Sequence, residues 1–158
     1  MASPDRLRPS ATFASVRGQL NFPARGDVFR PFGAPDGYGK KTKGLALRTR
    51  VEAQVTSPID GWVVYAGPFR RYGQLLIIDA GDGYHVLLAG MEKTHVSAGQ
   101  FVLNGEPVGI MGAEAKPSAA IGRIKERSKP VLYVEFRKDG QSIDPQPWWQ
   151  ADNMKARG

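Results

Sequence analysis

The sequence predicts an all-β domain, and two observations support this expectation. Five Asp-Gly or Asn-Gly dipeptides punctuate the chain, and such pairs tolerate the positive φ angles that tight hairpin turns require. Short β-prone runs lie between them, without the longer period of an amphipathic helix. The 158 residues, with 41% hydrophobic residues, 19 Gly and 12 Pro, suffice to bury one core. We therefore expect antiparallel strands in two sheets, with long loops.

The turn dipeptides divide the chain into its expected elements. They are Asp36-Gly37, Asp60-Gly61, Asp82-Gly83, Asn104-Gly105 and Asp139-Gly140. The β-prone runs between them predict strands over residues 44–49, 54–57, 62–66, 75–79, 84–89, 108–111 and 130–137. Beyond the last strand we expect a helical turn near 147–152, with Trp148 and Trp149 capping the core.

Two segments lack any strand pattern. Residues 1–18 are polar and rich in Arg, and we expect a flexible lead-in there, before a domain over 19–150 and a tail over 151–158. Residues 113–129 combine small residues with five basic ones and show no period. This second segment is either a mobile, solvated loop or a docking element.

Charge and composition exclude several function classes. The net charge of +7 allows an anionic partner, but the aromatic stacking motif of nucleic-acid-binding β-modules is absent, so we expect no nucleic acid. Without Cys the chain has neither disulfides nor thiolate metal sites. No apolar run approaches the ~20 residues that span a bilayer, so we expect no transmembrane segment.

The closing run, Val131 to Arg137 followed by Asp139-Gly140 and Asp144 to Trp148, resembles the LytM/lysostaphin-type zinc peptidases, which cut peptidoglycan cross-links. Further matches lie in family order between residues 18 and 102. They are Gly18-Gln19-Leu20, Phe32-Gly33, Lys43-Gly44-Leu45, Val55 to Val64, Tyr65-Ala66-Gly67, Tyr72-Gly73, Leu76 to Asp79, Gly81 to Tyr84, and Val96 with Gly99 and Val102. The resemblance implies the LytM/lysostaphin-like fold, a duplicated hybrid motif.

The same resemblance implies a domain without the catalytic zinc. Where active relatives read His-x-Gly-x-Asp, this chain has Thr42 to Ala46; Gly90 replaces the histidine of a middle motif, and Val131 and Tyr133 replace a closing His-x-His pair. A catalytic zinc needs about three N or O ligands and an open position for water. We therefore expect no enzyme, no metal and no cofactor.

The two histidines of the chain do not restore a metal site. His85 and His95 are its only histidines, and neither stands at a family ligand position. A new site that uses both of them with Asp79 or Glu135 is an alternative, but two histidines without a spacing motif usually serve structure.

Loss of the zinc ligands is typical of the EnvC-type members of the family. The resemblance implies a non-catalytic activator of peptidoglycan (N-acetylmuramoyl-L-alanine) amidases in cell division and daughter-cell separation, located in the periplasm, with peptidoglycan as a second possible partner. The amidase would dock in the altered zinc groove. The partner-binding residues implied are Lys43, Ala46, Tyr72, Leu75, Tyr133 and Arg137.

Strand parity bears on the two strongest of these candidates. Tyr133 and Arg137 share one face of the closing strand, and Leu132, Val134 and Phe136 share the other, which should meet the core. Tyr and Arg often dominate protein interfaces, so these two are the first hot-spot candidates. The alternative is a cross-strand ion pair between Arg137 and a carboxylate, with Tyr133 packed at the sheet edge.

Three other functions remain open on the sequence. The first is a divergent zinc endopeptidase with unfamiliar ligands. The second is a module that binds peptidoglycan without activating an amidase. The third is a carrier domain, because residues 55–64 and 96–108 resemble the lipoyl/biotinyl half-barrel and Lys116 loosely resembles its modified lysine. The additional strands and the closing segment argue against the carrier domain.

Overall fold

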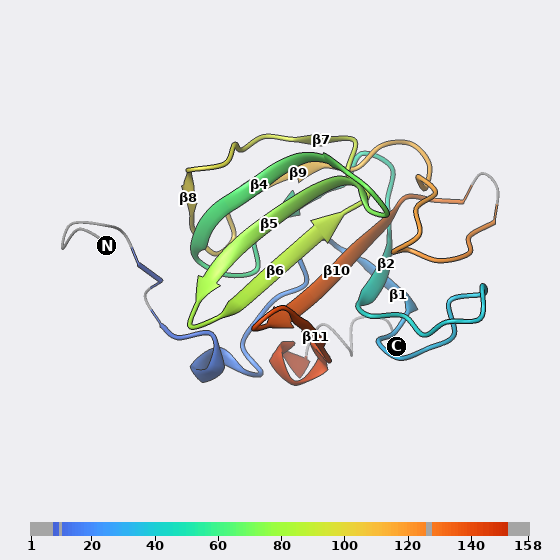
Figure 1. Cartoon of the computed structure of the whole chain (residues 1–158). Helices are drawn as coiled ribbons and strands as arrows, with labels where there is room; N and C mark the ends of the chain where they lie inside the picture. Colours follow the sequence, from blue (N-terminus) through green and yellow to red (C-terminus); the bar gives the residue numbers. More distant parts are fainter. Residues whose placement is uncertain (1–7, 10, 126–127, 152–158) are drawn as a thin grey trace.

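Two antiparallel sheets make up almost all of the regular structure (Figure 1). The computed structural model describes residues 8–9, 11–125 and 128–151. Its strands are β1 (Gly26–Arg30), β2 (Leu45–Thr49), β3 (Gln54–Thr56), β4 (Gly61–Phe69), β5 (Gly73–Gly81), β6 (Tyr84–Ala89), β7 (Lys93–Thr94), β8 (Phe101–Val102), β9 (Pro107–Ile110), β10 (Val131–Lys138) and β11 (Gln141–Ile143). Two short 3₁₀ turns, η1 (Ala14–Val16) and η2 (Gln146–Trp148), complete the described elements.

The larger sheet carries β10 near its centre. Its order is β1-β2-β10-β6-β5-β4-β8, with β11 also paired to β10, and the smaller sheet has the order β3-β9-β7. Residues 131–134 of β10 pair with β2, while residues 133–138 pair with β6. The predicted all-β, antiparallel, two-sheet fold is confirmed, and all seven predicted strands are present; the strand over 84–89 has the predicted bounds, and the other six have shifted ends.

Only two of the five turn dipeptides close hairpins between neighbouring strands. Asp82-Gly83 joins β5 to β6, and Asp139-Gly140 joins β10 to β11; all four residues have positive φ, as a type I′ turn requires. The prediction is wrong for Asp60-Gly61 and Asn104-Gly105, because the strands on either side of each belong to different sheets. Asp36-Gly37 turns within the loop between β1 and β2.

Four strands were not predicted, because each is too short or too polar to give a clear hydrophobic pattern in the sequence. The strand β1 (Gly26–Arg30) contains Gly, Asp and Arg and pairs only with β2. The strands β7 and β8 have two residues each, and β11 is polar and forms only because the turn at Asp139-Gly140 returns it along β10. Short or polar edge strands carry almost no periodic signal.

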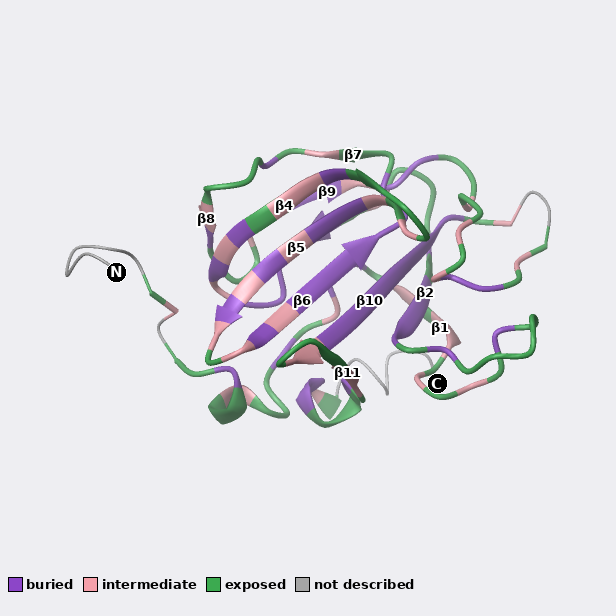
Figure 2. Cartoon of the chain, viewed as in Figure 1, coloured by how far each residue is buried: buried purple, intermediate pink, exposed green. Residues whose placement is uncertain are grey.

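The main core lies between the two sheets and continues to the C-terminal turn (Figure 2). Leu132, Val134 and Phe136 of β10 enter it and are fully buried, as the strand parity predicted. A second, smaller cluster lies on the opposite face of the large sheet. Its buried members are Ala46, Leu75, Leu87, Ala89, Ile121, Val131 and Tyr133. Both faces of β10 therefore carry buried side chains, one in the main core and the other in the smaller cluster.

Part of the expected lead-in belongs to the packed structure. Phe13 is only 2% exposed, stacks on Trp148 with ring centroids 5.0 Å apart, and accepts a hydrogen bond at its carbonyl from the indole of Trp148. Trp148 and Trp149 are buried, as predicted. Residues 1–7, 10 and 152–158 of the expected lead-in and tail lie outside the described residues, and the predicted domain boundaries stay predictions. Within the described residues, no helix has the length and hydrophobicity to cross a membrane.

Candidate functional site

A hollow of about 540 Å³ opens on the loop-covered face of the large sheet. The loop before β2, the β4–β5 hairpin, the loop before β10 and β10 itself each contribute to its walls; both loops lie on the right of the view, on the side of β2 (Figure 1). Its lining residues are Asp36, Lys40, Lys41, Thr42, Lys43, Pro68, Phe69, Arg70, Arg71, Tyr72, Ala119, Ala120, Tyr133, Glu135 and Arg137. We call this space the groove.

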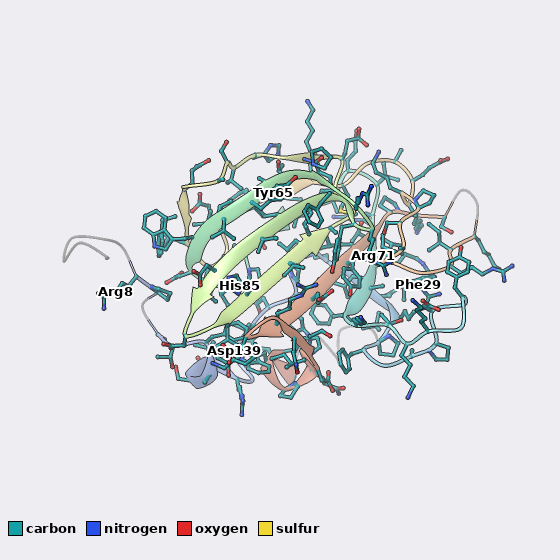
Figure 3. All side chains as sticks on the ribbon, viewed as in Figure 1. Arg8, Phe29, Tyr65, Arg71, His85 and Asp139 are labelled. Carbon is teal, nitrogen blue, oxygen red and sulfur yellow. The ribbon has the colours of Figure 1, made fainter. Side chains whose placement is uncertain are left out.

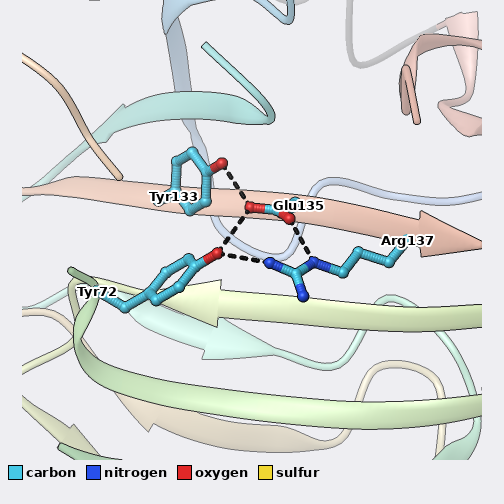
Figure 4. Close-up of polar contacts among 4 residues, drawn as sticks. All are labelled: Tyr72, Tyr133, Glu135 and Arg137. Atoms are coloured by element: carbon cyan, nitrogen blue, oxygen red, sulfur yellow. Dashed lines mark hydrogen bonds and ion pairs between the residues drawn. The ribbon is translucent and has the colours of Figure 1, made fainter. Parts of the chain in front are cut away.

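Glu135 is at the centre of a polar network on the groove face of β10 (Figure 4). Its Oε1 accepts hydrogen bonds from the hydroxyl groups of Tyr133, at 2.7 Å, and Tyr72, at 3.2 Å. Its Oε2 accepts from Nε of Arg137 at 2.6 Å. The guanidinium of Arg137 also donates to the Tyr72 hydroxyl at 2.9 Å. A buried carboxylate is thus compensated by one cation and two hydroxyl donors, as its burial requires.

The network controls the ionisation of the two tyrosines. Burial and the adjacent Glu135 carboxylate raise the pKa of Tyr133 far above its ordinary value. The same two causes raise the pKa of Tyr72, although Arg137 partly opposes them. Both hydroxyl groups therefore stay protonated at neutral pH and act as donors toward Glu135.

A continuous series of aromatic rings starts at Tyr65 and runs along the groove wall. Tyr65 contacts Phe69 at a centroid distance of 5.4 Å, Phe69 contacts Tyr72 at 6.3 Å, and Tyr72 contacts Tyr133 at 6.0 Å. Phe69 is 50% exposed and Tyr72 is half-buried, so this series leads from the surface to the buried Tyr133. Gly44 permits the close packing of Tyr133, because a Cβ at that position would lie 2.8 Å from the tyrosine ring.

The structure separates the six predicted partner-binding residues into two groups. Lys43, Tyr72, Tyr133 and Arg137 line the groove. Ala46 and Leu75 are 0% and 1% exposed and belong to the cluster beneath Tyr133, so their assignment to a contact surface is corrected: they support the groove. Tyr133 is itself only 1% exposed, so it offers a partner little surface to contact. Its hydroxyl group instead holds the Glu135 carboxylate in place.

Glu135 lines the groove but was not among the predicted partner-binding residues; the sequence suggested it only as an alternative metal ligand. Arg137 does form an ion pair, but its partner is two residues away on the same strand, so the alternative of a cross-strand pair is wrong. Tyr133 lies in a strand with neighbours on both sides and so does not pack at a sheet edge. The available signal was the spacing of residues 133, 135 and 137, which places all three side chains on one face.

The middle of the loop over residues 113–129 is held in place. Arg30 donates hydrogen bonds from its guanidinium to the carbonyl groups of Ile121, at 2.5 Å, and Arg123, at 2.7 Å. Ile121 is fully buried, and the amide of Ala120 donates to the carbonyl of Arg71. Ala119 and Ala120 line the groove, so this part of the loop forms one of its walls. The segment is therefore not simply a solvated loop; its Arg127 lies outside the described residues.

The residues at the family's zinc-ligand positions are packed. Ala46, Val131 and Tyr133 belong to the same buried cluster, and Ala46 pairs directly with Tyr133. Gly90 is buried with φ +100° and has the Val131 carbonyl where its Cβ would be. Thr42 is 3% exposed, and its hydroxyl has no hydrogen-bond partner within the part of the chain that the structure describes. Residues of these types offer no ligand set for zinc.

The histidines do not join this site. His85 is half-buried on β6, where it pairs in register with Asp79 and Arg137, and Figure 3 shows it on the sheet, away from the loops that enclose the groove. His95 is exposed after β7. No group of three or more His, Cys, Asp or Glu residues that could hold a metal ion exists among residues 8–9, 11–125 and 128–151.

Comparison with known proteins agrees with this geometry. Residues 40–145 match Peptidase family M23. The chain is 30% identical to the murein hydrolase activator EnvC of Escherichia coli over 84% of its own length and 29% of that protein. It is 35% identical to the cell division protein DipM of Caulobacter vibrioides, over 78% of the chain and 19% of that protein. The chain thus spans less than a third of either relative.

A solved structure supports the fold independently. Helicobacter pylori Csd3 superposes with a TM-score of 0.65 at 19% identity, over 84% of this chain and 35% of that one. At this identity the likeness establishes the fold and says nothing of activity. The predicted LytM/lysostaphin-like fold is thereby confirmed.

Proposed function

Because this chain belongs to Peptidase family M23, we propose that it is a non-catalytic activator of peptidoglycan (N-acetylmuramoyl-L-alanine) amidases in the periplasm, acting during cell division and daughter-cell separation. The relatives named as murein hydrolase activators support this proposal. The groove is the docking site, and Lys43, Tyr72 and Arg137 are the residues that contact the amidase.

One observation supports the proposal: at the family's closing zinc-ligand positions this chain has a packed network of Tyr, Glu and Arg side chains in place of metal ligands. Where the family holds its closing ligands, this chain has Tyr133, whose hydroxyl donates to Glu135. That carboxylate in turn orients Arg137 at the groove wall. Tyr and Arg held by fixed partners lose little conformational entropy on binding, a feature of interface hot spots.

Such a domain activates by binding preference alone. If the groove captures an element that blocks the amidase's own active site, the amidase shifts to its open state by the difference between the affinities for its open and closed states. A change from 1% to 99% open requires a difference of about 10⁴-fold, or about 5.5 kcal/mol.

The test compares hydrolysis of purified peptidoglycan by the chain alone, by a zinc amidase from the same organism, and by both together. We expect no products from the chain alone and a strong increase in amidase products from the mixture. EDTA-sensitive cleavage by the chain alone would identify a divergent endopeptidase instead. Co-sedimentation with peptidoglycan without any amidase stimulation would identify a wall-binding module.

A matched pair of charge reversals locates the interaction. Lys43→Glu changes a groove residue, and Lys93→Glu makes the same change on β7 of the small sheet; both side chains are exposed, so neither change should disturb folding. We expect Lys43→Glu to reduce stimulation at least tenfold and Lys93→Glu to leave it unchanged. Equal effects of the two variants would contradict docking in the groove.

A further inference from the structure

The charges around the groove are strongly unbalanced. Six cationic side chains line it, against two carboxylates, and both carboxylates are already satisfied. Glu135 is held by Arg137 and two tyrosine hydroxyl groups. Asp36 accepts hydrogen bonds from the backbone amides of Tyr38 and Lys40, which lower its pKa.

The other five cations have no such compensation. Within the described ranges, no carboxylate forms an ion pair with the lining cations other than Arg137. These five are Lys40, Lys41, Lys43, Arg70 and Arg71. All five side chains are exposed, so solvent screens them while the groove is empty. An occupant that displaces this water must itself bring negative charge, because burying cations unpaired is costly.

A second, independent feature calls for a hydrogen-bond acceptor. Thr42 lines the groove between Lys41 and Lys43, and its hydroxyl is buried without a partner in the part of the chain that the structure describes. An unpaired buried hydroxyl costs free energy that a ligand acceptor would recover. The hydroxyl is covered in this conformation, so neighbouring side chains must move aside when the occupant enters.

The groove also has apolar surface, and this favours an anionic occupant that carries apolar groups over one that does not. Phe69, Tyr72, Ala119 and Ala120 line it beside the cations. A phosphate-bearing wall polymer would leave these side chains without apolar contacts, whereas a protein segment that alternates acidic and apolar side chains would satisfy both sets.

We propose that the occupant of the groove is a protein segment carrying Asp or Glu next to apolar residues, with one carboxylate bound by the Thr42 hydroxyl and the lysines beside it. This inference rests on the proposed function for the identity of the partner, and adds the chemistry by which the partner is recognised. It makes Thr42, at a former metal-ligand position, a residue that determines specificity.

Isosteric replacement separates recognition from folding. Thr42→Val keeps the side-chain shape and removes the unpaired hydroxyl, so the free chain should be as stable as wild type or slightly more stable. Its affinity for the amidase, measured by calorimetry, should fall about tenfold, since a hydrogen bond to a charged acceptor is lost. Thr42→Ser, which keeps the hydroxyl, should bind within about twofold of wild type.

Zero-length cross-linking tests the partner's chemistry directly. A carbodiimide joins carboxylates to amines in contact, so we expect amide cross-links from Lys40, Lys41 or Lys43 to Asp or Glu of the bound amidase, identified by mass spectrometry. Their yield should be lower with Thr42→Val at matched concentration. Cross-links confined to other lysines, or amidase displaced from the groove by teichoic acid or polyphosphate without any such cross-link, would overturn the proposal.

The two hypotheses can fail separately. If the wild-type chain neither binds nor stimulates any amidase, the proposed function fails. If wild type and Thr42→Val bind an amidase equally, or the cross-links avoid the three lysines, only the acidic-segment inference fails.

Discussion

The two faces of β10 differ in what they contact: one lies in the core, and the other carries the polar network to which we assign partner binding. Leu132, Val134 and Phe136 are buried in the main core, where apolar side chains of similar volume should stabilise the fold about equally well. Glu135 and Arg137, on the other face, have specific partners at specific distances. Substitutions on the first face should therefore affect folding, whereas those on the second should affect binding more than their stability cost explains.

The largest effect is expected on the core face. Phe136→Ala removes a fully buried ring that contacts Phe13, Trp148 and Trp149. We expect the free energy of unfolding to fall by about 4 kcal/mol, measured by urea denaturation. Phe136→Leu, the matched control, should cost clearly less and leave amidase stimulation normal. Lost stimulation in a folded Phe136→Leu protein would contradict the division between the faces.

The next largest effect is expected at the centre of the groove network. Glu135→Gln leaves Arg137 without its ionic partner and replaces an acceptor oxygen by an NH₂ group facing hydroxyl groups. We expect a loss of about 2–3 kcal/mol in the free energy of unfolding, below the full cost of a buried pair because Arg137 is 36% exposed.

A double variant tests whether this loss arises from the unpaired charge. Glu135→Gln combined with Arg137→Met should regain part of the stability, because no uncompensated cation remains. It should not regain amidase stimulation, which needs the guanidinium at the groove wall. If the stability loss of the double variant equalled the sum of the losses of Glu135→Gln and Arg137→Met measured singly, the pair would not be coupled.

Alkaline pH provides a third test of the same network. The pKa of Tyr133 is raised in the folded chain, so its stabilisation is complete below its unfolded value of about 10 and is lost as the pH rises above it. By pH 11 the free energy of unfolding should fall by about 1.4 kcal/mol through this residue. Urea denaturation between pH 8 and 11 checks this, with Tyr133→Phe as the variant whose slope is shallower.

The two faces also differed in how far the sequence could predict them. Strand parity placed Leu132, Val134 and Phe136 in the core, because alternation depends only on the local backbone. It placed Tyr133 and Arg137 on the opposite face as well. It could not show that Ala46 and Leu75 lie beneath Tyr133, since that depends on how three separate strands pair.

The loops were less predictable for a related reason. The groove wall at Ile121 is fixed by hydrogen bonds from Arg30, 91 residues earlier in the chain. Such long-range contacts between side chain and backbone leave no periodic signal in the sequence. The unpaired hydroxyl of Thr42 is also invisible there, because burial without a partner is a property of the assembled site.

The smallest stability change, and the sharpest comparison, is expected for Tyr72→Phe. The lost hydroxyl makes a long bond to Glu135 and accepts one from Arg137 on a half-buried ring, so unfolding should become easier by only about 0.5 kcal/mol. Arg137 loses one of its two partners, however, and its position at the groove wall loosens. We therefore expect a threefold to tenfold loss of amidase stimulation at nearly unchanged stability.

Tyr38→Phe is the matched control for this variant, because Tyr38 is 66% exposed and does not line the groove. It should alter neither stability nor stimulation. Binding losses that exceed stability losses would thus be confined to the groove face of the sheet, the opposite of the pattern expected for Phe136. If Tyr72→Phe lost no more stimulation than its small loss of folded protein explains, the groove face would be structural like the core face. The recognition role of the network would then be refuted.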